Sequence, residues 1–279
     1  MLSIRVMTPA DLDLAIGWAA DEGWNPGLGD ALPYRAADPD GFLMGFIGEE
    51  PVTTISVVAY GAHFGFLGFY ICHPGFRGLG YGMQTWHAGI DRLGTRTIGL
   101  DGVVAQQDNY RESGFMLAHR NIRFGGRVAI EAPDDPRLVP VTPALAAAVA
   151  ACDAAFFPAP RGAFLHLWLN GEGGRFALAF VEDGRVTGYG VIRPAVTGFK
   201  IGPLFAPHEE AAELLFRALA AKAGGEPVFI DPPEPNGAAL ALAERHGLTP
   251  AFETARMYRG PAPELPLGAT YGITSFELG

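Results

Sequence analysis

The segment 77–82 carries the strongest chemical signal in this sequence. It reads Arg-Gly-Leu-Gly-Tyr-Gly and lies between a predicted strand that ends at Cys72 and a predicted helix that begins near Met83. Glycines let the backbone approach a ligand closely, and the start of a helix offers unpaired N–H groups and the positive end of a dipole. The segment therefore favours a cradle for a pyrophosphate group.

Two familiar nucleotide-binding patterns do not fit this segment. A Walker loop requires a Gly-Lys-Ser/Thr ending, which is absent. A dinucleotide G-x-G-x-x-G pattern that begins at Gly78 requires glycine where Met83 stands. The alternative interpretation is a glycine-rich turn that binds no ligand, and the loop alone leaves both readings open.

The elements that must position this loop are mixed helices and strands. Thr8 suits the cap of a helix and Pro9 its first position, so we expect a helix there. The turn-rich stretch 22–41 is predicted to be irregular. The remaining elements are expected to be a hairpin (42–47 and 52–59), a buried strand (64–72), a helix (83–93), a strand (97–100), a short helix near residue 110 and a last strand (116–124).

The sequence repeats itself over its two halves. Thr8-Pro9-Ala10 recurs 134 residues later as Thr142-Pro143-Ala144, and the hairpin sequence that starts at Phe42 recurs from Phe176. We interpret this as a tandem duplication, with one domain at 1–130, a second at 137–279 and a Pro/Asp-rich boundary at 131–136. In the second half, 209–223 is predicted to be a helix. The implied fold class is α/β, of the α+β type, with a mixed, mostly antiparallel sheet flanked by helices.

The glycine segment resembles the acyl-CoA signature of the GNAT superfamily of N-acetyltransferases, Arg/Gln-x-x-Gly-x-Gly/Ala. Arg77, Gly80 and Gly82 fall on its fixed positions. The lead-in Cys72-His73-Pro74 and the pattern Tyr-x-x-x-Gly-Phe at 110–115 also match, as does the order of elements over the first half. The resemblance implies two tandem GNAT lobes, the first of them catalytic.

The resemblance also implies how the donor, acetyl-CoA, would bind and react. Its pyrophosphate would lie on the backbone amides of 78–82 and its pantetheine along the strand 69–72. An amine would attack the thioester directly, with a backbone N–H near Cys72 holding the oxyanion. The implied donor-binding residues are Ile71, Cys72, Arg77, Gly78, Leu79, Gly80, Tyr81 and Gly82.

Tyr110 matches the tyrosine with which the family protonates the departing CoA thiolate. A phenol with a pKa of about 10 can donate to a thiolate; the alternative is a half-buried aromatic without a role. One departure is Val103, which stands where the family has asparagine. Cys72 could form an acyl-enzyme, but packing on a buried strand is the favoured interpretation.

The general base and the acceptor wall are less sharply defined. Glu22 is the preferred catalytic base, with His63 and His73 as alternatives, because all three flank the predicted cleft; a surface role is open for each. The irregular segment that begins at Glu22 corresponds to the GNAT loop that lines the acceptor site. A tryptophan beside an acid can hold a cation over its ring. We therefore expect the substrate to contact Trp24, Asn25 and Asp30, and more weakly Tyr34.

The second half lacks the cradle. Its matching segment, 201–210, has no glycine run, and Glu209 and Glu210 stand where a pyrophosphate needs positive potential. The tyrosine position is Ala243. This half resembles the degenerate C-terminal lobe of tandem GNAT proteins. Asp231 and Arg256 could complete the acceptor pocket, although a scaffold role is favoured.

Composition limits the partners. Acids outnumber Lys and Arg by 30 to 20, which gives a formal net charge of −10 and disfavours nucleic acid. The two cysteines, Cys72 and Cys152, fit no zinc spacing, and 145–157 is too short for a membrane span. No secretory signal precedes the first helix. We expect a cytoplasmic, metal-free monomer or homodimer that neither inserts into a membrane nor binds nucleic acid.

The predicted function is transfer of an acetyl group from acetyl-CoA to a primary amine of a small molecule or peptide. Two alternatives stay open. One is an acyltransferase that uses a different acyl donor. The other is a non-catalytic module that senses acyl-CoA or mediates an interaction.

Overall fold

A computed structural model describes all residues 1–279. The first half contains β1 (Leu2–Val6), α1 (Pro9–Asp21), α2 (Ala31–Ala37), β2 (Phe42–Ile47), β3 (Glu50–Tyr60), β4 (Phe64–Cys72), α3 (Tyr81–Leu93), β5 (Thr97–Val103), α4 (Gln107–Glu112) and β6 (Met116–Arg127). The second half contains β7 (Leu138–Pro140), α5 (Pro143–Asp153), α6 (Gly162–Trp168), β8 (Phe176–Glu182), β9 (Arg185–Pro194), β10 (Phe199–Phe205), α7 (Glu209–Ala220), β11 (Pro227–Ile230), α8 (Gly237–Arg245), β12 (Thr249–Arg259) and β13 (Thr270–Gly272). None of these helices is long and apolar enough to cross a membrane.

The helices and strands expected from local signals form, although α2 was not among them. At the start of α1, the Thr8 hydroxyl accepts from the Asp11 N–H (3.2 Å) and the Asp11 carboxylate accepts from the Thr8 N–H (2.8 Å), a complete capping box. The stretch 22–41 is not wholly irregular, because it contains α2. This helix has only seven residues and no side-chain cap, so its local signal is weak.

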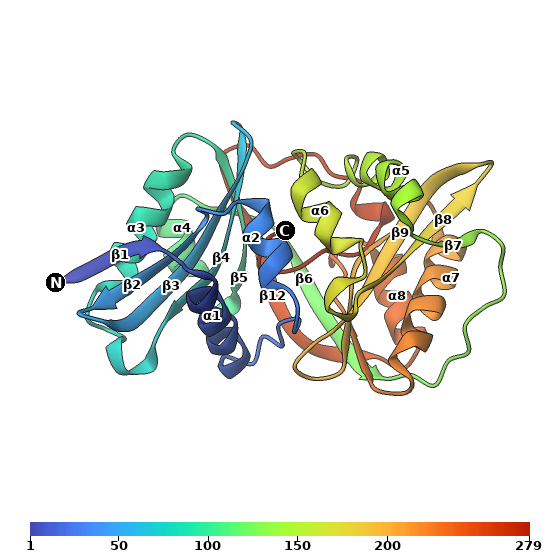
Figure 1. The fold of residues 1–279 in the computed structure, drawn as a ribbon, viewed down its shortest axis with the longest axis horizontal. Helices are drawn as coiled ribbons and strands as arrows, with labels where there is room; N and C mark the ends of the chain where they lie inside the picture. The colour runs from blue at the N-terminus through green and yellow to red at the C-terminus, as the bar shows by residue number, and fades with distance from the viewer.

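The strands form one mixed sheet in the order β1-β2-β3-β4-β5-β12-β6-β11-β10-β9-β8-β7, with β13 added to β10. Only the pairs β4–β5 and β10–β11 are parallel. Helices flank the sheet in each half (Figure 1). The mixed, mostly antiparallel α/β class predicted from the sequence is confirmed.

The two halves exchange strands at the centre of this sheet. β12, from the second half, lies between β5 and β6, and β6, from the first half, pairs with β11. Figure 1 shows these two long strands crossing between the halves, with the C-terminus beside them. Strands from both sides of the predicted boundary at 131–136 thus belong to one sheet. The division into two domains, 1–130 and 137–279, stays a prediction.

Each half also contains a fork, where two parallel strands separate. In the first fork, β4 and β5 pair only from Phe64–Thr97 to Leu67–Leu100. Phe69 then takes a left-handed conformation (φ 45°), which forms a bulge against β3 that the Thr54 hydroxyl supports by donating to the Phe69 carbonyl (2.7 Å). Beyond this point β4 follows β3 and β5 follows β12, so residues 68–72 and 101–103 face one another across an opening.

Candidate active site

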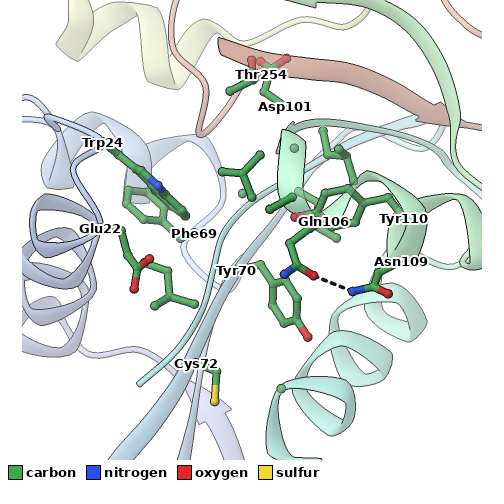
Figure 2. Close-up of a pocket in the computed structure, with 18 of the residues that line it drawn as sticks. Glu22, Trp24, Phe69, Tyr70, Cys72, Asp101, Gln106, Asn109, Tyr110 and Thr254 are labelled. Carbon is green, nitrogen blue, oxygen red and sulfur yellow. Dashed lines mark hydrogen bonds between the residues drawn. The ribbon is translucent and has the colours of Figure 1, made fainter. Parts of the chain in front are cut away.

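A cavity of about 670 Å³ lies in the first fork. Its walls come from β4, β5, the glycine segment after β4, α4 and two segments of the second half. Figure 2 shows Trp24 and Phe69 on one side of the opening and Gln106 and Tyr110 on the other. The fold thereby places the predicted cradle, the predicted tyrosine and part of the predicted acceptor wall around one space.

The glycine cradle, residues 78–82, ends at the start of α3. Gly78 and Gly80 have φ values of 79° and 80°, a conformation that other residues adopt only with strain. Gly80 is the cap of α3; no side chain satisfies the first N–H groups of the helix, and the first turn contains no acid. The free N–H groups and the helix dipole suit an anionic group, so the residues present fit the pyrophosphate of an acyl-CoA.

Most of the predicted donor-binding residues line the cavity. Those that do so are Ile71, Cys72, Arg77, Gly78, Gly80 and Gly82, whereas the Leu79 and Tyr81 side chains lie outside it. A Cβ at position 82 would approach the Tyr70 hydroxyl to 3.0 Å, so glycine keeps this wall open. Burial raises the pKa of the Cys72 thiol. Cys72 therefore stays protonated near neutral pH, as expected for a packing residue rather than a nucleophile.

Tyr110 reaches the cavity from α4. Its ring stacks on Trp86 of α3 with centroids 5.5 Å apart, and it lies so close to β5 that a Cβ at Gly102 would come within 2.3 Å of it. Burial raises the pKa of Tyr110 above its usual value near 10. The phenol therefore remains protonated and able to donate a proton.

Three polar side chains near Tyr110 escaped the sequence analysis. Tyr70 lines the cavity, and burial raises its pKa to about 12. Gln106 and Asn109 also line it and are joined by a hydrogen bond of 2.6 Å (Figure 2). Asn109 adds an amide beside Tyr110 although Val103 replaces the family asparagine. The position of Asn109 directly before Tyr110 in the sequence could have indicated that it lies near the site.

The three candidate bases of the first half lie in different places relative to the cavity. Glu22 lines the cavity, but its carboxylate forms an ion pair with Arg77 of the cradle segment. His63 is exposed in the turn between β3 and β4, and His73 packs against Trp18 with ring centroids 5.3 Å apart. Neither histidine lines the cavity. Glu22 is thus the member of the three that faces the site.

Of the predicted acceptor residues, Trp24 lines the cavity, whereas Asn25, Asp30 and Tyr34 do not. Asn25 exchanges two hydrogen bonds with the Thr197 backbone, at 2.8 and 3.1 Å. Asp30 is 1% exposed and pairs with Arg193 at 3.1 Å. Both side chains join the two halves of the chain, through partners that local sequence could not reveal.

The second half contributes to the cavity through residues that the sequence analysis did not single out. They are Phe252 and Thr254 of β12 and Phe276 and Glu277 of the C-terminal segment. The two proposed contributors, Asp231 and Arg256, do not line it. Asp231 is buried against Arg123 (2.7 and 2.8 Å), and Arg256 forms a bidentate pair with the cavity residue Asp101 (2.7 and 2.8 Å).

Comparisons with known proteins identify the family of this chain. The family model for the acetyltransferase (GNAT) domain matches residues 149–272. A holothin acyltransferase from Pseudoalteromonas sp. (strain SANK 73390) is 34% identical over 265 residues, covering 94% of this chain and 89% of that protein.

Among solved structures, a Pyrococcus horikoshii protein provisionally named as an acetyltransferase has a TM-score of 0.82 at 23% identity, covering 100% of this chain and 96% of its own. A tandem GNAT protein from the clavulanic acid biosynthesis pathway has a TM-score of 0.64 at 14% identity, covering 94% and 100%. These two likenesses concern the fold.

The chain belongs to the GNAT superfamily of N-acetyltransferases. It is an acyltransferase, and acyl-CoA is the donor that this family uses. The resemblance identified from the glycine segment is thus confirmed.

Proposed function

We propose that this protein transfers an acetyl group from acetyl-CoA to a primary amine of a small molecule, in the first fork. The observation that carries the proposal is the uncapped start of α3 behind the glycines, next to a cavity of about 670 Å³ that extends to Tyr110. The cradle supplies anion-binding amides, and the cavity supplies an enclosed path to a proton donor.

Residues of the first half would hold the donor. The amides of 78–82 and the Arg77 guanidinium face its phosphates, and the separated edges of β4 and β5 offer backbone groups to its pantetheine arm. When bound, acetyl-CoA supplies the thioester. A neutral amine attacks the carbonyl carbon, the C–S bond breaks, and Tyr110 gives its proton to the departing sulfur. The amine's surplus proton leaves to solvent, and solvent returns a proton to Tyr110.

The walls at the other end of the cavity favour a small acceptor. Trp24, Phe69, Phe252 and Phe276 give it an aromatic lining that suits an apolar body. The related holothin acyltransferase is named for a single compound, which agrees with a small-molecule acceptor. We therefore favour a small amine over a peptide.

Calorimetric titration tests the proposal. We expect one acetyl-CoA per chain, and release of free CoA thiol when a panel of small primary amines is added. Binding without turnover of any amine would indicate an acyl-CoA sensor, and turnover only with a longer acyl-CoA would indicate another donor. Two sites per chain would contradict a single working fork, and no binding would reject the proposal.

A further inference from the structure

The C-terminal segment, residues 273–279, brings a carboxylate from the end of the chain into the first fork. Gly68 on β4 makes room for it, because a Cβ there would lie 2.3 Å from the Glu277 carbonyl oxygen. The Tyr60 hydroxyl donates to the Leu278 carbonyl (3.2 Å), which fixes the segment. Glu277 is 2% exposed, and it is one of the residues that line the cavity.

Glu277 differs from the other buried acids. Asp30, Asp153 and Asp231 each pair with an arginine, whereas no basic nitrogen lies within 4.0 Å of Glu277. Its Oε2 accepts from the Tyr34 hydroxyl at 3.0 Å, but that hydroxyl also lies 3.2 Å from Asp30 and has a single proton. Its Oε1 is buried and accepts from no group of the protein. A buried acceptor without a donor is costly and calls for a functional explanation.

The charged groups around Glu277 lie outside the cavity wall. Arg123, Arg193 and Lys200 lie near enough for the negative charge of Glu277 to favour their charged forms. Burial nevertheless lowers the pKa of Lys200 to about 8, and its Nζ has no hydrogen-bond partner. None of these three side chains lines the cavity. The cations therefore act on the carboxylate at longer range. Oε1 itself is shielded from solvent, so a ligand in the cavity reaches it only after a small movement of the Glu277 side chain.

We propose that Oε1 of Glu277 accepts a hydrogen bond from the amine of the acyl acceptor, and that the acceptor is a small amine with an aromatic ring. Trp24, Phe69, Phe252 and Phe276 hold the ring. One free carboxylate oxygen matches one N–H donor, whereas a polyamine would need further acids. Glu277 is thus an acceptor-binding residue supplied by the second half. This inference rests on the proposed function.

The experiment compares wild type, Glu277→Gln and Glu264→Gln with 2-phenylethylamine as acceptor and saturating acetyl-CoA. Glutamine keeps the size of the side chain and an oxygen for Tyr34 but removes the charge. Because a hydrogen bond to a charged group is lost, we expect the KM for the amine to rise about 10- to 100-fold, with the Kd for acetyl-CoA unchanged. Glu264 is an exposed residue before β13, so its variant should behave as wild type.

Inhibition of the wild-type protein gives a second test that does not depend on a variant that folds. 2-Phenylethanol carries an O–H donor, whereas methyl 2-phenylethyl ether has a similar shape and none. We expect the alcohol to inhibit competitively with the amine at about tenfold lower concentration than the ether. Equal inhibition constants would contradict the role of Oε1.

The outcomes separate this inference from the proposed function. Wild-type turnover of 2-phenylethylamine with an unchanged KM in Glu277→Gln overturns the role of Glu277 and leaves the acetyltransferase standing. Turnover of spermidine but not of 2-phenylethylamine overturns the acceptor class. Failure of wild type to bind acetyl-CoA rejects the proposed function itself.

Discussion

The two forks of this protein start from the same geometry and end differently. In the first, β4 and β5 separate after Leu67 and Leu100, and the cavity opens between them. In the second, β10 and β11 separate after Ile201 and Ile230, but β13 then pairs with β10 through Leu204–Gly272. The chain thus fills the second opening with its own strand and leaves the first open as a cavity.

The helices that follow the two forks differ in the same sense. The start of α3 has no side-chain cap and no acid in its first turn. The start of α7 is capped by His208, whose Nδ1 accepts from the Ala211 N–H at 3.2 Å, and Glu209 and Glu210 follow. The N–H groups and dipole that an anion would need are therefore already engaged in the second half. The two turns thus differ in the few side chains that leave the first N–H groups of a helix free or engage them.

The largest expected difference between the forks concerns their tyrosines. Tyr110→Phe should lower kcat about 10²- to 10⁴-fold, because the proton donor is lost, and should leave the Kd for acetyl-CoA nearly unchanged. Tyr271→Phe, on the strand that fills the second fork, should leave both values unchanged. Steady-state kinetics and titration measure them. Full activity of Tyr110→Phe would contradict the role of Tyr110 as the general acid.

Side-chain packing should affect the stability of the protein in both forks, but the affinity for acetyl-CoA only in the first. Leu204 is fully buried beside β13, so Leu204→Ala should lower the free energy of unfolding by about 2–5 kcal/mol while acetyl-CoA affinity stays the same. Leu67 lines the first fork. Leu67→Ala should therefore lower the free energy of unfolding and also alter the affinity for acetyl-CoA. Denaturant unfolding and calorimetry measure the two effects, and a changed affinity in Leu204→Ala would show that the second fork also serves the ligand.

A charge placed in the cradle should discriminate between the two turns. Gly80→Glu adds a negative charge and a side chain at a φ of 80°, and should weaken acetyl-CoA binding about 100-fold or more, since like charges placed together cost several kcal/mol. Pro207→Glu adds the same charge at the exposed position directly before the His208 cap of α7 and should leave the Kd for acetyl-CoA unchanged. Isothermal titration gives both Kd values. Equal weakening would contradict a single cradle.

The strand exchange predicts that the halves unfold together and share one sensitivity to acid. His119 on β6 faces Arg256 of β12 in register, and burial lowers its pKa to about 4. The folded state thus disfavours the proton that the unfolded chain binds below about pH 6.5. The resulting stabilisation is complete above that pH and declines as the pH falls through 4, by at most about 3 kcal/mol.

Thermal unfolding from pH 7 to 4 checks this prediction. We expect one transition for the whole chain at each pH. His119→Gln should flatten the decline in stability, and Glu264→Gln, at an exposed site, should not. Two separate transitions would show that the halves are independent despite the exchanged strands.

The sequence predicted the elements wherever a local signal existed. The Thr8 cap and the apolar run of β4 are properties of neighbouring residues, and both appear at the predicted positions. The glycine segment likewise predicted a tight turn, and Gly78 and Gly80 adopt the positive φ values that glycine allows. α2 was missed because seven residues among turn formers carry little helical signal.

The site was predicted only in part, for the same reason. The sequence predicted an anion-binding loop, a tyrosine beside it and a second half without either, and the structure places the loop and Tyr110 around one cavity. The tertiary structure alone decided that Asp30 and Asn25 join the two halves, that β12 enters the first half of the sheet, and that Glu277 faces the cavity. These contacts join residues far apart in the chain, and their energies depend on burial and complementary charge rather than on periodicity. No local pattern encodes them, so they emerge only when the chain folds.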